Sequence, residues 1–380
     1  MKSASNSSNK ITLFLPSIGC GGAERVTVNL AEGIVALGFE VDLVFVTSDD
    51  PPLLTDIPAG VKLIDLEAGR VANSLPKLIR YLRQERPIAL LSALEHTNVI
   101  ALVAARLARV DTRVVVSVHT TLSRAIKDST LLRARIFPML MRWSYPWASK
   151  VVAVSEAARE DLLNTVGLDP DSVRVILNPV VTPTLFEKAK APSPHPWFAS
   201  GEPPVILGVG RMVTAKNFQL LINAFARVRK EQPARLILLG EGELLSSLKR
   251  QVEELGITDD VEMPGFAENP YAYMARAQIF VLSSIFEGLP TVVIEALALG
   301  TPVVSTDCPS GPAEILEQGR YGTLVPVDDE KALASGILQQ LRDPTPRSEM
   351  IKSWQPYELH KIAREYLSLL VGEKGVGAGG

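Results

Sequence analysis

Two glutamates, Glu287 and Glu295, carry the clearest chemistry in the sequence. They lie eight residues apart in the segment FEGLPTVVIEA, residues 286–296. Glu295 falls among Val, Ile, Ala and Leu, where a carboxylate is costly unless it is hydrogen-bonded. Hydroxyl groups of a sugar would satisfy it, so we interpret this segment as a binding site for a sugar-like ligand. A helix charge that reaches solvent is the alternative interpretation.

The same segment predicts a helix whose start can hold an anion. Pro290 suits the first helical position and Gly300 a C-terminal cap, so we expect a short, mostly apolar helix over 290–299. The unpaired amide groups at its start, from Gly288 to Thr291, can bind an anionic group.

A second cluster, GVGR over residues 208–211, ends a predicted strand, and Lys216 follows five residues later. Glycines let the backbone approach a ligand closely. Arg211 and Lys216 can neutralise a diphosphate, because a guanidinium group forks onto phosphate oxygens.

A third cluster, GCGGAE over residues 19–24, follows the first predicted strand. A dinucleotide site needs a third small residue in Gly-x-Gly-x-x-Gly, which allows close packing of helix on strand. Glu24 occupies that position, which argues against a dinucleotide bound as in dehydrogenases. Gly21 and Gly22 form either a tight turn or a flexible loop that approaches a ligand.

Short β-branched runs alternate with segments of helical period, which predicts parallel sheets covered on both faces. Expected strands in the first half are 11–15, 41–46, 88–92, 114–118, 151–154 and 173–177, and expected helices are 23–37, 75–85, 96–109, 131–147 and 156–166. Seven prolines predict a linker over 179–204. Beyond it we expect strands at 205–209, 235–239, 279–282, 302–305 and 323–325, and helices at 217–230, 243–255, 290–299 and 330–342.

The expected fold class is therefore α/β, with two Rossmann-like, doubly wound parallel-sheet domains that face each other across a cleft. We expect the first domain over 1–183 and the second over 184–356. A C-terminal helix at about 357–371 is expected to pack back on the first domain. The tail, 372–380, is expected to be disordered.

Composition excludes several classes of protein. The 39 basic and 42 acidic residues give a net charge of −3, so no global positive field exists to hold nucleic acid. Two cysteines, Cys20 and Cys308, exclude a disulfide framework and fit a reducing compartment. Because we find neither a signal-peptide pattern nor a long apolar run, we expect a soluble, cytoplasmic protein.

A basic and aromatic segment, residues 124–150, has two interpretations. This segment contains six basic residues and a single acidic one, Asp128. Trp143, Tyr145 and Trp147 lie in the same stretch. This pattern fits a peripheral contact with an anionic membrane surface, at the inner face of the plasma membrane. A solvated helix face with aromatic core residues is the alternative.

The Glu-x7-Glu spacing of Glu287 and Glu295 resembles the signature of family 4 of the retaining glycosyltransferases, which have the GT-B fold. The resemblance covers nearly the whole chain. It includes GGAER at 21–25, GVGR with Lys216-Asn217, GEGE at 240–243, VEMPGF at 261–266 and TPVV at 301–304. The segment DCPSGPAE at 307–314 is most similar to bacterial members that assemble lipid-linked oligosaccharides, lipopolysaccharide or exopolysaccharide.

The resemblance implies a role for each matching residue. Arg211 and Lys216 would bind the donor diphosphate, Glu295 the ribose and Glu287 the donor sugar, while the backbone from Met263 to Phe266 would carry the base. The implied catalytic residues are Glu287, His119, Arg211 and Lys216. The implied donor site comprises Gly21, Gly22, Gly210, Arg211, Lys216, Gly240, Met263, Phe266, Glu287, Gly288, Leu289, Pro290, Thr291 and Glu295. Candidates on the acceptor side are His119, Arg133, Arg135 and Arg142.

The reaction implied is the transfer of a hexose or N-acetylhexosamine with retention of configuration. UDP is the expected nucleotide of the donor, and a lipid-linked oligosaccharide or polysaccharide precursor is the expected acceptor. We expect no metal and no cofactor, because positioned cations and helix amides can stabilise the departing phosphate. No nucleic-acid partner is expected.

One departure from the family pattern and two alternative classes remain. Asn178-Pro179-Val180-Val181 stands where many relatives have Asn-Gly-Val-Asp, so no function is carried onto that position. The alternatives are a dinucleotide-dependent oxidoreductase and a two-domain small-molecule binding protein.

Overall fold

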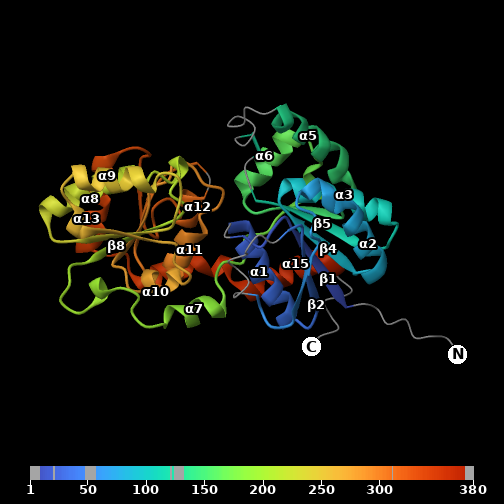
Figure 1. Cartoon of the computed structure of the whole chain (residues 1–380), viewed down its shortest axis with the longest axis horizontal. Coiled ribbons are helices and arrows are strands. Elements are labelled where there is room, and N and C mark those ends of the chain that lie inside the picture. Colours follow the sequence, from blue (N-terminus) through green and yellow to red (C-terminus); the bar gives the residue numbers. More distant parts are fainter. Residues whose placement is uncertain are drawn as a thin grey trace. The chain divides into compact units, whose positions relative to one another are not determined.

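The computed structural model describes residues 9–19, 22–47, 57–119, 122–123, 132–309 and 311–372, with the backbone alone for 132–136. The chain divides into two compact units (Figure 1). Unit 1 comprises Met1–Pro179 and Leu359–Gly380, and unit 2 comprises Val180–Glu358. The units therefore change at 179/180 and 358/359, a few residues from the expected boundaries at 183/184 and 356/357.

Unit 1 contains a sheet of seven parallel strands in the order β3-β2-β1-β4-β5-β6-β7. The strands are β1 (Lys10–Leu15), β2 (Glu40–Phe45), β3 (Val61–Asp65), β4 (Ala89–Ala93), β5 (Arg113–Val118), β6 (Lys150–Ala153) and β7 (Val173–Val175). The sequence did not predict β3, because this edge strand is only half-buried and lacks a continuous apolar run. The parallel arrangement itself is confirmed.

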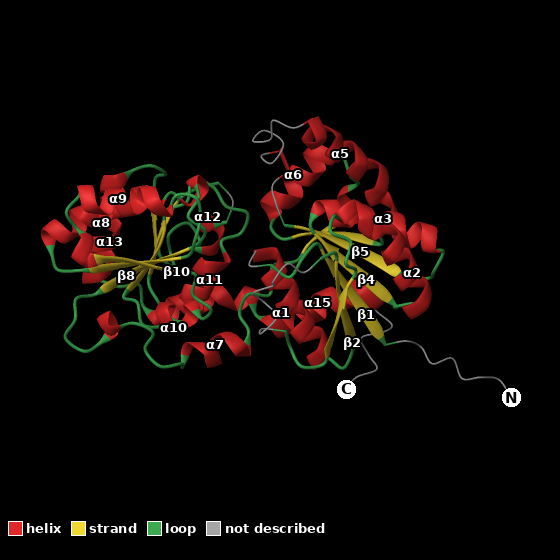
Figure 2. Cartoon of the chain, in the orientation of Figure 1, coloured by secondary structure: helices red, strands yellow, loops and turns green. Residues whose placement is uncertain are grey.

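Helices cover both faces of this sheet (Figure 2). They are α1 (Gly22–Ala36), α2 (Leu75–Glu85), α3 (Glu95–Ala108), α5 (Leu132–Ser144), α6 (Glu156–Val166) and α15 (Leu359–Val371). One core joins the sheet to α2, α3, α5 and α6, and the other joins it to α1 and α15. The expected helix 131–147 is shorter, because a 3-10 turn, Tyr145–Trp147, with Pro146 inside it, follows α5.

The last helix, α15, packs on α1 within unit 1. Gly33 on α1 permits this close approach, since a Cβ atom there would lie 2.7 Å from the Cβ of Ala363. Ile362, Ala363 and Tyr366 are almost completely buried in the shared core. Helix α15 thus covers part of one face of the unit 1 sheet.

Unit 2 contains six parallel strands in the order β10-β9-β8-β11-β12-β13. These are β8 (Val205–Val209), β9 (Arg235–Leu239), β10 (Val261–Gly265), β11 (Ile279–Leu282), β12 (Val303–Thr306) and β13 (Thr323–Val325). The longer helices are α8 (Phe218–Glu231), α9 (Leu245–Glu254), α11 (Thr291–Ala298), α13 (Glu330–Arg342) and α14 (Arg347–Trp354), and the short ones are α7 (Pro183–Ala189), α10 (Pro270–Met274) and α12 (Pro312–Ile315). Helices α8, α9 and α13 lie on one face of the sheet, and α10 and α11 lie on the other (Figure 1).

The prediction that residues 179–204 form only a linker is wrong, because helix α7 begins at Pro183. Proline is tolerated in the first turn, where its missing N–H leaves no helical hydrogen bond unmade. Thr182 caps this helix, since its Oγ1 accepts from the backbone N–H of Leu185 at 3.1 Å. Leu185 is buried, so the helix also contributes to packing.

A polar cluster ties β1 and β2 to α2 inside unit 1. The Lys10 ammonium lies 3.3 Å from Asp42 Oδ2 and also donates to Glu85. The Tyr81 hydroxyl donates to Asp42 Oδ2 at 2.8 Å. Only 3% of the Asp42 side chain is exposed, so this carboxylate depends on its protein partners for compensation.

Replacing Lys10 by Met is expected to destabilise unit 1 by about 3 kcal/mol, because Asp42 would stay buried without its cation. Urea unfolding followed by circular dichroism measures this loss. Arg80→Met, at an exposed position on α2, is the control and should change stability by less than about 0.5 kcal/mol. Equal effects of the two substitutions would show that the Lys10 contacts add nothing.

Candidate functional site

The candidate site of unit 2 lies where the direction of winding changes. Strand β8 connects toward β9 and β10, whereas its other neighbour, β11, connects toward β12 and β13. In open parallel sheets, ligands bind beyond the carboxyl ends of the strands at such a switch point. The loop after β8 carries Arg211 and Lys216, and the loop after β11 carries Glu287.

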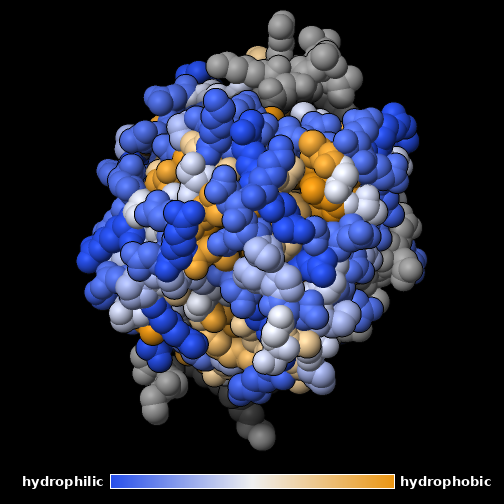
Figure 3. Space-filling model, turned by 90° about the vertical axis from the view of Figure 1, so that its left-hand side faces the viewer, coloured by the Kyte–Doolittle hydropathy of each residue, from blue (hydrophilic) through white to orange (hydrophobic). Residues whose placement is uncertain are grey.

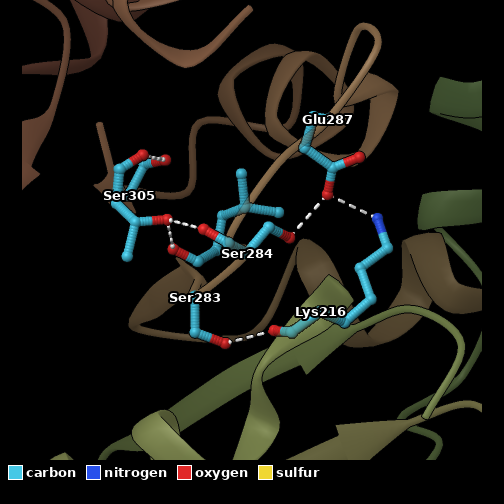
Figure 4. A network of polar contacts seen from close by, with 7 residues as sticks. Lys216, Ser283, Ser284, Glu287 and Ser305 are labelled. Atoms are coloured by element: carbon cyan, nitrogen blue, oxygen red, sulfur yellow. Dashed lines mark hydrogen bonds and ion pairs between the residues drawn. The ribbon is translucent and has the colours of Figure 1, made fainter. Parts of the chain in front are cut away.

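The structure brings Lys216 and Glu287 into direct contact at this point. The Lys216 Nζ atom lies 2.6 Å from Glu287 Oε1 (Figure 4). The exposed fractions of the two side chains are only 21% and 12%, so this pair is substantially desolvated. Such an ion pair interacts more strongly than one in bulk water.

One hydroxyl group contacts the Glu287 carboxylate, and a second fixes the backbone of the residue that provides the first. Ser284 Oγ donates to Glu287 Oε1 at 2.6 Å, and Thr306 Oγ1 donates to the Ser284 carbonyl at 2.6 Å (Figure 4). Among the described residues, these side-chain contacts of Glu287 all reach Oε1. Its second oxygen, Oε2, can therefore accept a hydrogen bond from a ligand hydroxyl.

The backbone beside Arg211 is fixed by its neighbour across the sheet. Gly240 has φ +134°, and a Cβ atom there would lie 2.0 Å from the Gly210 carbonyl oxygen. The N–H of Gly210 donates to the Leu239 carbonyl at 2.9 Å. The loops after β8 and β9 therefore lie backbone to backbone, which only glycine at position 240 allows. The Arg211 residue is exposed at this edge.

Strand β10 contains an irregularity close to its end. Its pairing with β9 shifts register between Glu262 and Gly265, and Met263 lies in that interval. Beyond the strand, Phe266 presents an aromatic side chain that is 47% exposed. Backbone polar groups and an exposed ring can together contact a planar heterocycle.

Helix α11 differs slightly from the prediction. It begins at Thr291, so Pro290 is the N-cap rather than the first helical residue, and the helix ends at Ala298 rather than 299. The short loop from Gly288 to Pro290 follows Glu287 directly. Glu295 is 4% exposed within α11, and it interacts with another group of the chain.

In unit 1, His119 follows β5 and makes a hydrogen bond with a residue of that strand. Its Nε2 atom lies 2.9 Å from Ser117 Oγ. Its Nδ1 atom is buried, with no hydrogen-bond partner among the described residues. Burial lowers the pKa of His119 to about 4, so the imidazole is neutral near pH 7.

Some predicted site residues stand apart from these contacts. Gly21 lies outside the described residues, as do the side chains of Arg133 and Arg135. Gly22 begins helix α1, and Arg142 is exposed on α5. His119 and Arg142 belong to unit 1, whereas the Lys216–Glu287 pair belongs to unit 2.

Two family models match the chain, one for each half. "Glycosyltransferase Family 4" matches residues 20–182, and "Glycosyl transferases group 1" matches residues 192–355. A Campylobacter jejuni enzyme, N-acetylgalactosamine-N,N'-diacetylbacillosaminyl-diphospho-undecaprenol 4-alpha-N-acetylgalactosaminyltransferase, is 31% identical over 96% of this chain and 100% of its own length. The chain belongs to glycosyltransferase family 4.

Solved structures show the same fold as this transferase. The crystal structure of Anabaena HepE in complex with UDP has a TM-score of 0.76 at 21% identity, and the match covers 95% of this chain and 99% of that one. WaaG, a glycosyltransferase involved in lipopolysaccharide biosynthesis, has a TM-score of 0.71 at 15% identity, over 95% and 100% of the chains. The expected family and the GT-B fold are confirmed.

The sequence analysis gave no site role to the polar residues at the switch point of unit 1 of this transferase. Strands β1 and β4 are neighbours there, and Glu24 follows the first while Glu95 and His96 follow the second. Desolvation lowers the pKa of His96, and the negative charges of Glu95 and Glu24 partly oppose this shift. Two adjacent ionisable residues, Glu95 and His96, close behind a buried strand were the signal that could have indicated a site here.

The buried His119 predicts a pH dependence of stability. Its folded pKa is lower than the ordinary value of 6.5, so the unfolded chain binds a proton that folded unit 1 does not. Unit 1 should therefore lose stability as the pH falls from 6.5 toward 4. His119→Gln should flatten this part of the profile, measured by urea unfolding at a series of pH values. His360→Gln, an exposed position on α15, is the control, and an equal flattening there would contradict the assignment.

Proposed function

We propose that the protein is a retaining glycosyltransferase that uses a UDP-sugar as donor. It moves a hexose or N-acetylhexosamine to a lipid-linked oligosaccharide or polysaccharide precursor. The observation that carries this proposal is the desolvated Lys216–Glu287 pair at the switch point of unit 2, with a 2.6 Å separation. It provides a cation for a phosphate and a fixed carboxylate for a sugar hydroxyl within one contact.

The donor would lie along the carboxyl edge of the unit 2 sheet. UDP is the ligand in the HepE structure, which supports UDP as the nucleotide here. The backbone near Met263 would bind the base, Glu295 the ribose and the Glu287 carboxylate the donor sugar. Arg211 and Lys216 would neutralise the diphosphate, assisted by the amides at the start of α11.

In the proposed reaction, an acceptor hydroxyl attacks the anomeric carbon from the face that the diphosphate leaves. The new bond joins the acceptor oxygen to the sugar, the bond between the sugar and the phosphate oxygen breaks, and the hydroxyl proton passes to the phosphate. Negative charge grows on the departing UDP, where Arg211 and Lys216 stabilise it without reorganisation. His119 is neutral and would donate or accept a hydrogen bond near the sugar.

The proposal includes no metal, because the cations of the chain can compensate the diphosphate charge. The Asp-x-Asp sequence of this chain, Asp169-Pro170-Asp171, forms a capped 3-10 turn, in which Asp169 accepts from the N–H of Asp171 at 3.0 Å. Transfer in excess EDTA should therefore match transfer in untreated enzyme. Loss of activity that Mg²⁺ or Mn²⁺ restores would overturn this part of the proposal.

The proposed acceptor is lipid-linked. The Campylobacter jejuni relative is named for a diphospho-undecaprenol acceptor. A second enzyme of that organism, named as a PP-undecaprenol alpha-1,4-N-acetyl-D-galactosaminyltransferase, is 26% identical over 96% of this chain. None of the described helices is long and apolar enough to cross a membrane. An enzyme with a lipid-linked acceptor must still reach the membrane surface.

Helix α5 offers a surface for that contact. Met139, Leu140 and Trp143 on this helix are 71%, 39% and 57% exposed, and Arg142 is exposed beside them; we call these four residues the α5 patch. Trp143 packs edge to face on Trp147, with ring centroids 4.2 Å apart, and Arg106 of α3 lies over Trp147. On the face shown in Figure 3, apolar residues form separate areas among hydrophilic ones. Exposed Trp and Met next to arginines fit the interface of an anionic bilayer.

Arg211→Ala and Glu295→Gln are each expected to lose transfer while the fold is kept. A charge-assisted contact contributes about 1.5–3 kcal/mol, which corresponds to a loss of roughly 10- to 150-fold or more in rate. Transfer from UDP-sugars to a diphospho-undecaprenol-linked acceptor measures the loss, with melting temperature as a check on folding. Arg250→Ala, an exposed arginine on α9, is the control. Wild-type turnover in either site variant would contradict the donor assignment.

The membrane proposal predicts that the protein sediments with anionic liposomes at low salt and is released at high salt. Each basic residue near an anionic leaflet contributes on the order of 1 kcal/mol. Changing Arg133, Arg135 and Arg142 to Glu should weaken sedimentation, and so should Trp143→Ser. Three charge reversals on unit 2, at Lys190, Lys230 and Arg250, provide a control of equal charge. If the wild-type protein does not sediment with anionic liposomes at low salt, a soluble acceptor is the better interpretation.

A further inference from the structure

The turn that carries Lys216 is fastened to the loop after β11. This turn is a 3-10 helix, Thr214–Lys216. The N–H of Ile285 donates to the Ala215 carbonyl at 2.9 Å. Ser283 Oγ donates to the Lys216 carbonyl at 2.8 Å (Figure 4). These contacts fix the backbone of the turn on the side of Glu287.

Asn217 fastens the other end of the turn. It has φ +48°, a left-handed conformation that asparagine tolerates better than most residues with a Cβ atom. The same residue ends the 3-10 helix and occupies the N-cap position of α8, without a capping hydrogen bond from its side chain. Its side-chain amide donates to Asp328 Oδ1 at 2.7 Å.

Asp328 is itself placed by the start of the neighbouring helix. It has φ +60° and directly precedes Asp329, which caps α13 by accepting from the N–H of Ala332 at 2.8 Å. Helices α8 and α13 lie side by side in unit 2 (Figure 1). The hydrogen bond from Asn217 to Asp328, which we call the 217–328 link, thus joins the starts of two packed helices.

We infer that Asp328 is a positioning residue for Lys216 and acts through Asn217. This inference rests on the proposed function, in which Lys216 binds the donor diphosphate. The Lys216 side chain runs over Gly210, where its Cε would lie 3.3 Å from an added Cβ atom, before it reaches Glu287. A left-handed turn that lost the 217–328 link would sample other conformations and carry the ammonium group away from that place.

Glycine variants test the link without penalising the left-handed backbone. Asp328→Gly and Asn217→Gly each remove one partner, so each should weaken UDP binding by about 3- to 10-fold. The double variant should lose no more than either single one, because both remove the same contact. Calorimetry with UDP, repeated with inorganic pyrophosphate, measures these affinities.

Asp328→Asn separates the hydrogen bond from the charge. The asparagine carbonyl can still accept from Asn217, whereas the negative charge is lost. UDP affinity should therefore stay within about twofold of the wild type. A loss as large as that of Asp328→Gly would overturn the inference.

Arg227→Ala is the matched control. It removes a second contact between α8 and α13, the ion pair from Arg227 to Glu330, and leaves the 217–328 link intact. This variant should bind UDP like the wild type. An equal loss of affinity would mean that general packing of the two helices, rather than Asp328, sets the position of Lys216.

Hydrogen exchange gives a readout that needs no ligand. The amides of Lys216 and Asn217 donate to the carbonyls of Val213 and Thr214 at 3.0 and 3.2 Å. They should exchange faster in Asp328→Gly and unchanged in Arg227→Ala. Unchanged exchange or unchanged UDP affinity in Asp328→Gly would overturn the inference. A wild-type protein that binds neither UDP nor pyrophosphate would overturn the proposed function, and the exchange rates would still decide whether Asp328 holds the turn.

Discussion

All strands of each sheet run in the same direction, and the placement of the candidate residues depends on this constraint. A parallel connection must cross the sheet through a helix or long segment, so every strand ends at the same edge and is followed by a loop there. In unit 2 these loops hold Gly210 after β8, Gly240 after β9 and Glu287 after β11. Residues distant in sequence therefore gather along one edge without any element devoted to that purpose.

Within that edge, the Lys216–Glu287 pair shows how the proposed anionic donor and a partly buried carboxylate can share one site. A carboxylate that is 12% exposed would repel a diphosphate if it stood alone. The ammonium group compensates this charge, and the Ser284 hydroxyl adds a hydrogen bond. The ion pair is already formed before a donor binds, so these two side chains need little rearrangement during the proposed transfer.

The sequence predicted the features that are local and missed those that depend on pairing across the sheet. Buried strands such as β4 and β5 and the Glu287–Glu295 spacing follow from periodicity and residue type. Strand β3 was not predicted, because its residues are partly or fully exposed and show no continuous apolar run. Helix α7 was hidden by prolines that in fact suit a first turn. The contacts from Thr306 to Ser284 and from Asn217 to Asp328 could not be predicted. The first joins residues more than twenty positions apart and the second joins residues more than a hundred apart, and both form only after the strands are ordered.

The return of α15 to unit 1 affects the order in which the protein can be assembled. Synthesis proceeds from the N-terminus, so the whole of unit 2 emerges before the helix that covers one face of the first sheet. Until then, the apolar surface of α1 and the central strands that later contacts Ile362 and Tyr366 remains open. Unit 2 is contiguous in sequence and can close its core first. The domain that begins the chain is consequently the last one to be finished.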